Sequence, residues 1–350
     1  MSLAEPIFVT GANGFIGRHL VARLVDEGRR VRALVLPDET VPDGWEGRVE
    51  VRRGDISNAE SVEHTMAGAA SVFHLAAVVN DWGSDELHRL VTVEGTRHVL
   101  GGAARRSMRA ILASSIVVYG HHLQDAVCVE DQEWGEAFGP YSRSKQAQEK
   151  IAWELAEKEG LKLSVVRPAN VFGPGSKLWV EELAELLQRK MPTVIGRGEG
   201  GAGLCYVHNL VDILIRAATT EKAIRRVYNA ADGSDVTWKG YVTDLAAQAG
   251  APPPRSVHAG LAWKLAPWLE RAWRLVRARN RPPLTREALN LAGSDLRIPV
   301  DRARDELGFT PVASYDEAMT AVGAALKLLA DRIDAVRSIS PRGVGTTNPS

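Results

Sequence analysis

The stretch VTGANGFIG, residues 9–17, decides the fold of this chain. Its glycines, at positions 11, 14 and 17, stand between an apolar run, PIFVTG (6–11), and an amphipathic pattern, FIGRHLVARLVDEG (15–28). The first gap between glycines is one residue longer than in the common dinucleotide fingerprint G-x-G-x-x-G. A glycine turn between a strand and a helix is the context that a phosphate site needs, because phosphates meet the N–H groups at the helix start. In this interpretation Gly11 permits the tight turn, Gly14 lets the backbone approach a pyrophosphate, and Gly17 lets the helix pack on the strand.

The first half of the chain alternates β-branched apolar runs with helical patterns. We predict strands at residues 6–11, 29–36, 49–55, 70–77, 109–120 and 161–168, and helices at 15–28, 59–68, 85–106 and 141–159. A repeated strand–helix–strand order predicts an α/β fold of the Rossmann type, with a doubly wound parallel sheet.

The regular alternation of strand and helix patterns ends at about residue 175. We therefore predict a dinucleotide-binding domain at residues 1–175 and a smaller substrate-binding lobe at 176–335, with some segments returning to the sheet. Thr237 is a plausible helix cap in this second part. The polar end, 336–350, is expected to be a flexible tail.

Composition excludes several classes of protein. The 350 residues hold 43 Lys and Arg against 43 Asp and Glu, so no overall charge favours nucleic acid as a partner. The two cysteines are far apart in sequence, and no metal-ligand spacing is visible among the histidines, so we expect no metal site and a cytoplasmic location. We see neither a signal-peptide pattern nor an apolar run of the roughly 18 residues that a spanning helix needs.

The segment YSRSK, residues 141–145, carries a candidate catalytic pair. Tyr141 and Lys145 are four residues apart and share a face of a helix. A free phenol has a pKa of about 10, and a nearby ammonium lowers that pKa toward the range of a useful base. Ser115 is placed at the carboxyl end of a predicted strand, where its hydroxyl can hold a substrate oxygen for Tyr141. Taken singly, Ser115 also fits a serine that binds its own backbone.

Together these motifs resemble the extended short-chain dehydrogenases/reductases, the NAD-dependent epimerase/dehydratase family. The matching motifs are TGxxGxxG at 10–17, Gly54-Asp55 after the third predicted strand, HLAA at 74–77, Ser115 ahead of VYG at 118–120, YxxxK at 141–145 and RPANVFGPG at 167–175. The likeness extends through YVHNLVD and YNAADGSDVTW to about residue 238. The chain is most similar to the 3β-hydroxysteroid dehydrogenase and dihydroflavonol reductase-like group.

The resemblance implies an enzyme and a set of site residues. Ser115 orients a carbonyl or alcohol, Tyr141 moves the proton, and Lys145 lowers the pKa of Tyr141 and binds the nicotinamide ribose. The implied cofactor-binding residues are Gly11, Asn13, Gly14, Phe15, Ile16, Gly17, Asp38, Asp55, Ile56, Leu75, Ala76, Ala77, Tyr141, Lys145, Pro168, Asn170 and Val171. A homodimer is also expected from the resemblance.

The cofactor and the substrate follow from two smaller signals. Asp38 and Glu39 come just after the second predicted strand and repel a phosphate, which favours NAD over NADP. Nucleotide-sugar members of the branch place an arginine where this chain has Ala202, and Arg197 is out of register with it. We therefore predict that the enzyme interconverts a secondary alcohol and a ketone on an apolar, steroid-like substrate. The alternative is a nucleotide-sugar epimerase or dehydratase that transfers hydride transiently.

The segment 261–281 mixes tryptophans, leucines and arginines. Its members are Trp263, Leu265, Trp268, Leu269, Arg271, Trp273, Arg274, Leu275, Arg277, Arg279 and Arg281. Three readings stay open at this point: a helix packed on the lobe with its arginines in water, an apolar lid over the substrate, and a peripheral contact with an anionic membrane.

Overall fold

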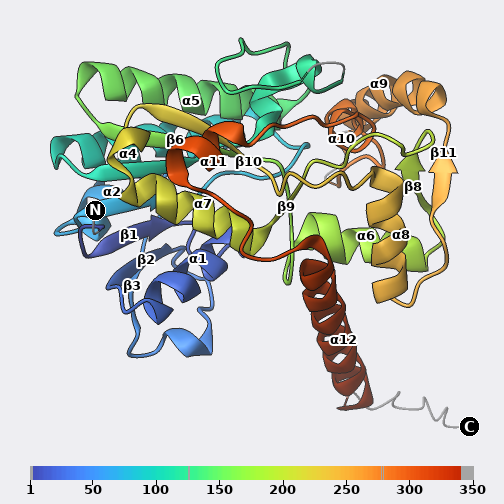
Figure 1. The fold of residues 1–350 in the computed structure, drawn as a ribbon, viewed down its shortest axis with the longest axis horizontal. Coiled ribbons are helices and arrows are strands. Elements are labelled where there is room, and N and C mark those ends of the chain that lie inside the picture. Colours follow the sequence, from blue (N-terminus) through green and yellow to red (C-terminus); the bar gives the residue numbers. More distant parts are fainter. Residues whose placement is uncertain (1–2, 125–126, 277, 279, 340–350) are drawn as a thin grey trace, which may run out of the picture.

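A parallel sheet of seven strands forms the centre of the molecule (Figure 1). The computed structural model describes residues 3–124, 127–276, 278 and 280–339. The strands are β1 (Ile7–Thr10), β2 (Val31–Val35), β3 (Val49–Arg53), β4 (Ser71–His74), β5 (Arg109–Ala113), β6 (Lys162–Pro168) and β10 (Arg226–Ala230). Their order is β10-β6-β5-β4-β1-β2-β3, so the chain starts near the middle and winds outward in both directions. The predicted doubly wound α/β fold is confirmed.

Helices cover both faces of this sheet (Figure 1). One face packs on α2 (Ala59–Met66), α4 (Gly95–Arg105) and α5 (Pro140–Lys158), and the other on α1 (Phe15–Asp26) and α7 (Val207–Thr219). Alternate residues of β1 supply the two cores, because successive side chains of a strand point to opposite faces: Ile7 and Val9 join one core and Phe8 the other. The predicted helix at 85–106 runs as α3 (Asp85–His88), a π-helical segment (Arg89–Glu94) and α4.

The strand predicted at 109–120 is wrong beyond Ala113. Residues Ile116–Gln124 form 3₁₀ turns instead. The hydroxyl oxygen of Ser115 accepts a hydrogen bond from the Val117 amide at 3.3 Å, which offers the backbone an alternative to a strand. Gly120, at φ +57°, then turns the chain where a side chain would meet the backbone of Gly135 and Glu136. The apolar run IVVYG is therefore buried as a turn and not as a strand.

The second half of the chain builds a smaller lobe and also returns to the sheet. Its elements are β7 (Asn170–Phe172), α6 (Leu183–Gln188), β8 (Pro192–Ile195), β9 (Leu204–Tyr206), α8 (Trp238–Gln248), β11 (Arg255–Val257), α9 (Ala259–Leu275), α10 (Arg286–Ala292), α11 (Asp301–Leu307) and α12 (Tyr315–Ile339). Thr237 caps α8, as predicted, by accepting the Gly240 amide at 3.1 Å. Of the predicted tail, 336–339 belong to the last turn of α12 and 340–350 lie outside the described residues. No helix in the described residues is long and apolar enough to cross a bilayer.

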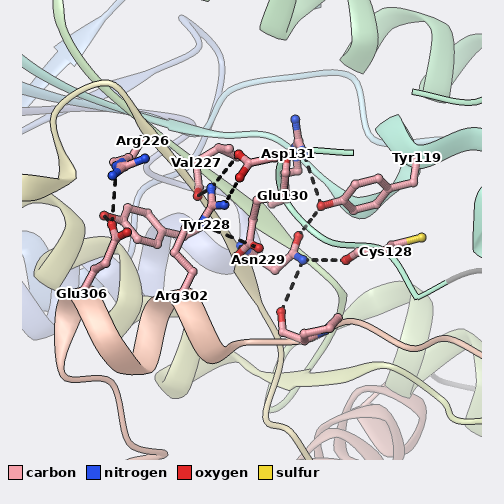
Figure 2. Close-up of polar contacts among 12 residues, drawn as sticks. Tyr119, Cys128, Glu130, Asp131, Arg226, Val227, Tyr228, Asn229, Arg302 and Glu306 are labelled. Carbon is pink, nitrogen blue, oxygen red and sulfur yellow. Dashed lines mark hydrogen bonds and ion pairs between the residues drawn. The ribbon is translucent and has the colours of Figure 1, made fainter. Parts of the chain in front are cut away.

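A buried polar network fastens α5 and the 3₁₀ turns to the edge of the sheet. Arg167, on β6, makes a two-point ion pair with Glu149 of α5, with N–O distances of 2.9 and 2.7 Å. Both side chains are almost fully buried, at 4% and 0% exposure. Arg167 also donates to the hydroxyl of Tyr119 at 3.1 Å. Figure 2 shows how Tyr119 continues to Asn229 on β10, and how Asn229 donates to the Cys128 carbonyl.

The outer part of the same network ties the C-terminal chain to β10. Arg302, on α11, pairs with Asp131 and donates to the Val227 carbonyl at 3.3 Å (Figure 2). The hydroxyl of Tyr228 donates to Glu306 at 2.8 Å. Strand β10 is thus held by hydrogen bonds from β6 on one side and by charged side chains of α11 on the other.

Glu149→Gln is expected to lower the free energy of unfolding by about 3–5 kcal/mol, because the Arg167 guanidinium stays buried without its counter-charge. Urea unfolding followed by circular dichroism measures the change. The matched control is Glu185→Gln, which breaks the exposed Glu185–Arg189 pair and should change stability by less than about 0.5 kcal/mol. Equal effects of the two substitutions would contradict the structural importance of the buried pair.

Candidate active site

The glycine turn leaves the start of α1 open to an anion. Gly14 is the N-cap of α1 and is exposed, and no side chain caps the helix. A Cβ on Gly11 would lie 2.8 Å from the Ala76 amide nitrogen, and one on Gly17 would lie 2.1 Å from the Gly11 carbonyl oxygen. The turn, the helix start and the 75–77 loop are therefore packed as closely as backbone allows. Exposed N–H groups at a helix N-terminus suit a pyrophosphate, so the residues present fit a dinucleotide.

A chain of buried hydrogen bonds joins this turn to the predicted catalytic lysine. The ring of His74 contacts the hydroxyl of Thr10 at 2.7 Å and that of Thr96 at 2.8 Å. Gln148 donates to Thr96 at 2.8 Å and accepts from the Lys145 ammonium at 2.9 Å. Burial, aided by the charge of Lys145, lowers the pKa of His74 to about 3, so the ring is neutral. These hydrogen bonds position Lys145 relative to the glycine turn. The sequence motif HLAA did not reveal this series of contacts.

The structure brings Ser115 and Tyr141 close together. Ser115 lies just beyond the carboxyl end of β5 and is 8% exposed, and Tyr141 stands in the first turn of α5. Burial raises the pKa of Tyr141 to about 12, and the nearby Ser115 hydroxyl opposes part of that rise. The neighbouring Ser114 hydroxyl is buried without a partner among the described residues. An unpaired buried hydroxyl at this edge marks a place where a bound molecule can be held.

Lys145 lies one turn below Tyr141, with its ammonium 6.0 Å from the phenol ring centroid. It donates to the Ala113 carbonyl at 3.0 Å as well as to Gln148. Burial lowers the pKa of Lys145 to about 7, and the carboxylate of Glu149 opposes that change. The expectation that Lys145 brings the pKa of Tyr141 below its ordinary value is not met by the protein groups alone, because desolvation of the phenol outweighs them.

The sequence analysis missed a carboxyl group from the second half of the chain. Glu287, on α10, accepts the Ser142 amide at 2.6 Å and so caps the start of α5 beside Tyr141. It is 3% exposed, and its second oxygen has no partner among the described residues. Burial raises the pKa of Glu287 to about 7, and its charge in turn raises the pKa of Tyr141. The sequence analysis assigned Glu287 no role, since it lies 146 positions after Tyr141, and only the fold brings the two residues together.

An ion pair holds the segment before α10 against the loop that follows β4. Arg281 makes a two-point contact with Asp81, and the Thr285 hydroxyl also donates to Asp81. Thr285 caps α10 in the same place. Glu287 is therefore presented to α5 by a helix that is anchored to the loop after β4.

The predicted adenosine side of the site is open. Asp38 and Leu36 are exposed beyond β2, and Asp55 uses one carboxylate oxygen to accept the Ser57 amide at 2.8 Å. Ile56 is buried against Gly95 of α4. Asn13 donates to the Thr40 carbonyl at 3.0 Å. Arg53, the last residue of β3, donates to the carbonyls of Leu36, Pro37 and Glu39 at 2.7–3.2 Å.

The remaining predicted contacts lie at the end of β6, at the start of α1 and after β4. Pro168 is buried, and Val171 is partly exposed. Asn170 is buried, with its amide group donating to the Ala202 carbonyl at 2.8 Å, so its side chain braces the 196–203 loop. Ala202 is itself fully buried. Arg197 is exposed and pairs with Glu199, so it does not replace the arginine that Ala202 lacks. Phe15 and Ile16 are partly exposed at the start of α1, and Leu75 and Ala77 are partly exposed after β4.

Comparison with known proteins agrees with this geometry. The model of the NAD dependent epimerase/dehydratase family matches residues 7–231. A 2-alkyl-3-oxoalkanoate reductase of Stenotrophomonas maltophilia is 27% identical, over 89% of this chain and 97% of that protein. A 3 beta-hydroxysteroid dehydrogenase/Delta 5-->4-isomerase of Mycobacterium tuberculosis is 25% identical, over 90% of this chain and 88% of that protein.

The fold is shared with solved structures of the same kind. MoeE5 in complex with UDP-glucose and NAD superposes with a TM-score of 0.73 at 24% identity, over 93% of this chain and all of that one. At this identity the likeness concerns the fold alone.

Gly17→Ala should weaken dinucleotide binding about tenfold or more, because its Cβ would force α1 away from the glycine turn. Fluorescence titration with NADH measures the affinity. Gly44→Ala is the matched control, since its Cβ would meet nothing within 4 Å. A folded Gly17→Ala protein that binds NADH as the control does would show that the turn does not hold the pyrophosphate.

Proposed function

Because the chain belongs to the NAD-dependent epimerase/dehydratase family, we propose that it interconverts a secondary alcohol and a ketone on an apolar, steroid-like substrate. The observation that carries the proposal is that the Ser115 hydroxyl lies close enough to the Tyr141 phenol to lower its pKa, at the carboxyl end of β5, with Lys145 on the next turn of α5. The carboxyl ends of parallel strands are where ligands bind in such sheets.

Each side chain has a role that its position supports. The Ser115 hydroxyl donates to the substrate oxygen and holds it beside Tyr141. The Tyr141 hydroxyl gives a proton to that oxygen during reduction, or takes one from the alcohol during oxidation. The Lys145 ammonium, fixed by Ala113 and Gln148, stabilises negative charge on the phenol oxygen. The bound dinucleotide supplies or accepts the hydride.

The preference for an apolar substrate rests on what surrounds the site. Ala202 is buried where a sugar diphosphate would need an arginine, and Arg197 is exposed and pairs with Glu199. On the other side, Phe138 stands three positions before Tyr141, and its ring contacts Trp263 of α9 at 5.7 Å between centroids. The names of the two relatives describe action on an alkyl oxo acid and on a hydroxysteroid, which both present a large hydrocarbon part.

We propose NAD as the preferred cofactor. The first residue after β2, Leu36, is apolar, and the acidic Asp38 and Glu39 follow it. Arg53 contacts this loop, where its Nη1 group donates to the carbonyls of Leu36, Pro37 and Glu39. A phosphate on the ribose would have to compete for that arginine next to two carboxylates.

Tyr141→Phe should lower the turnover number by a factor of about 10²–10⁴ and leave the dissociation constant for NADH nearly unchanged, because only the proton donor is lost. Absorbance at the reduced nicotinamide band follows turnover on a panel of 3β-hydroxysteroids, 2-alkyl-3-oxoalkanoates and nucleotide sugars. Net cofactor oxidation or reduction with an apolar compound is expected. Isomer formation from a nucleotide sugar alone, with no net cofactor change, would favour the epimerase alternative.

Glu287→Gln should shift the rising limb of the pH profile for alcohol oxidation to lower pH, by up to about one unit. The carboxylate of Glu287 raises the pKa of Tyr141, so removing its charge lets the phenolate form at lower pH. Gln keeps an oxygen for the Ser142 amide. The control, Glu185→Gln, should leave the profile in place, and an unmoved profile in a stable Glu287→Gln protein would refute the electrostatic role of this carboxyl group.

A further inference from the structure

Helix α9 turns its apolar side chains outward. Ala262 and Ala266 are fully buried and Glu270 is 6% exposed, so these residues mark the inner face. The opposite face carries Leu261, Leu265, Trp268 and Leu275, with exposed fractions of 51%, 44%, 68% and 85%, and Val276 follows at 70%. At 3.6 residues per turn these positions form one stripe. We call this stripe, with its five side chains, the outer stripe of α9.

A helix that only packs on the lobe shows the reverse pattern, with its apolar stripe toward the core. The first of the three interpretations accounts for the inner face, where Trp263 packs beside Leu289, but not for the exposed side chains of the outer stripe. The lid reading does not explain the outer stripe either, because a lid points its apolar side chains at the site. Contiguous exposed apolar surface of this kind marks an interaction site. Figure 1 shows α9 at the outer edge of the smaller lobe, away from the central sheet.

The charges beside the outer stripe have one sign. Lys264, Arg271 and Arg274 are exposed. The guanidinium of Arg271 lies 5.8 Å from the ring centroid of Trp268. The one acidic residue of α9, Glu270, is buried and paired with Arg286 at 3.0 Å, so it does not offset these cations at the surface. Arg277 and Arg279 lie outside the described residues.

We propose that the outer stripe of α9 docks on an anionic lipid surface. The leucines and Trp268 enter the boundary between headgroups and acyl chains, while Lys264, Arg271 and Arg274 meet lipid phosphates. A second copy of the chain fits the charges less well, since a two-fold contact places the stripe against itself and brings its cations together. This proposal concerns a surface and does not depend on the substrate.

The inner face of α9 connects this surface to the active site. Trp263 contacts Phe138, close to Tyr141. Glu270 accepts the Arg286 amide at 2.8 Å, and the next residue, Glu287, caps the start of α5. Docking on a bilayer therefore places the substrate side of the enzyme, and not its adenosine side, toward the lipid.

The test uses the full chain and sedimentation with large vesicles of phosphatidylcholine, alone or with about 30% phosphatidylglycerol as the anionic lipid. We expect binding to the anionic vesicles that falls as salt rises, and little binding to pure phosphatidylcholine. Leu265→Ser/Trp268→Ser should reduce the bound fraction about tenfold or more. Leu186→Ser/Leu328→Ser, which removes exposed apolar side chains from α6 and α12, is the matched control and should bind as the unchanged protein does.

Three results would overturn the proposal. The first is an unchanged protein that stays in solution with anionic vesicles. The second is binding that the control pair loses as much as the Leu265/Trp268 pair, which would mean general stickiness. The third comes from sedimentation velocity without lipid: a dimer that the Leu265→Ser/Trp268→Ser pair abolishes would identify a second copy as the occupant.

Discussion

The buried ion pair between Arg167 and Glu149 is the contact on which the site depends. It joins the carboxyl end of β6 to the middle of α5, and both side chains are buried away from water. Glu149 is four residues after Lys145, so the same carboxylate that neutralises Arg167 also favours the protonated form of the lysine. Through Tyr119 the pair extends to Asn229 on β10. The orientation of α5, which carries Tyr141 and Lys145, is therefore fixed by its contacts with the sheet.

The site itself is costly for the fold. A lysine whose pKa is lowered to about 7 and a carboxyl group whose pKa is raised to about 7 are both held away from water. Between about pH 7 and 10.5, Lys145 is protonated in the unfolded chain but neutral in the folded chain. Between about pH 4.5 and 7, Glu287 is ionised in the unfolded chain but protonated in the folded chain. Both shifts mean that ionising these groups in place opposes folding, as expected where side chains serve a reaction.

Patterns within short stretches of sequence predicted the features that depend on neighbouring residues. The glycine turn, the strand–helix alternation and the Tyr141–Lys145 spacing were sufficient for the central sheet and for the pair on α5. The end of β5 was missed because apolar β-branched residues occur both in strands and in buried turns. Here the Ser115 hydroxyl accepts the Val117 amide, which favours the turn. Glu287 and the His74–Thr96–Gln148 chain were missed because they exist only once distant segments pack together.

The position of β10 at the rim of the sheet has a consequence for how the protein is made. Strand β6 is complete at Pro168, but its outer neighbour begins only at Arg226. While residues 169–225 leave the ribosome, β6 exposes a row of unpaired N–H and C=O groups, which is the kind of edge that recruits foreign strands. The nascent chain thus passes through a stage at which the dinucleotide half is nearly whole and still open to mispairing. The long excursion through α7 is synthesised during that interval, and only the arrival of β10 closes the sheet.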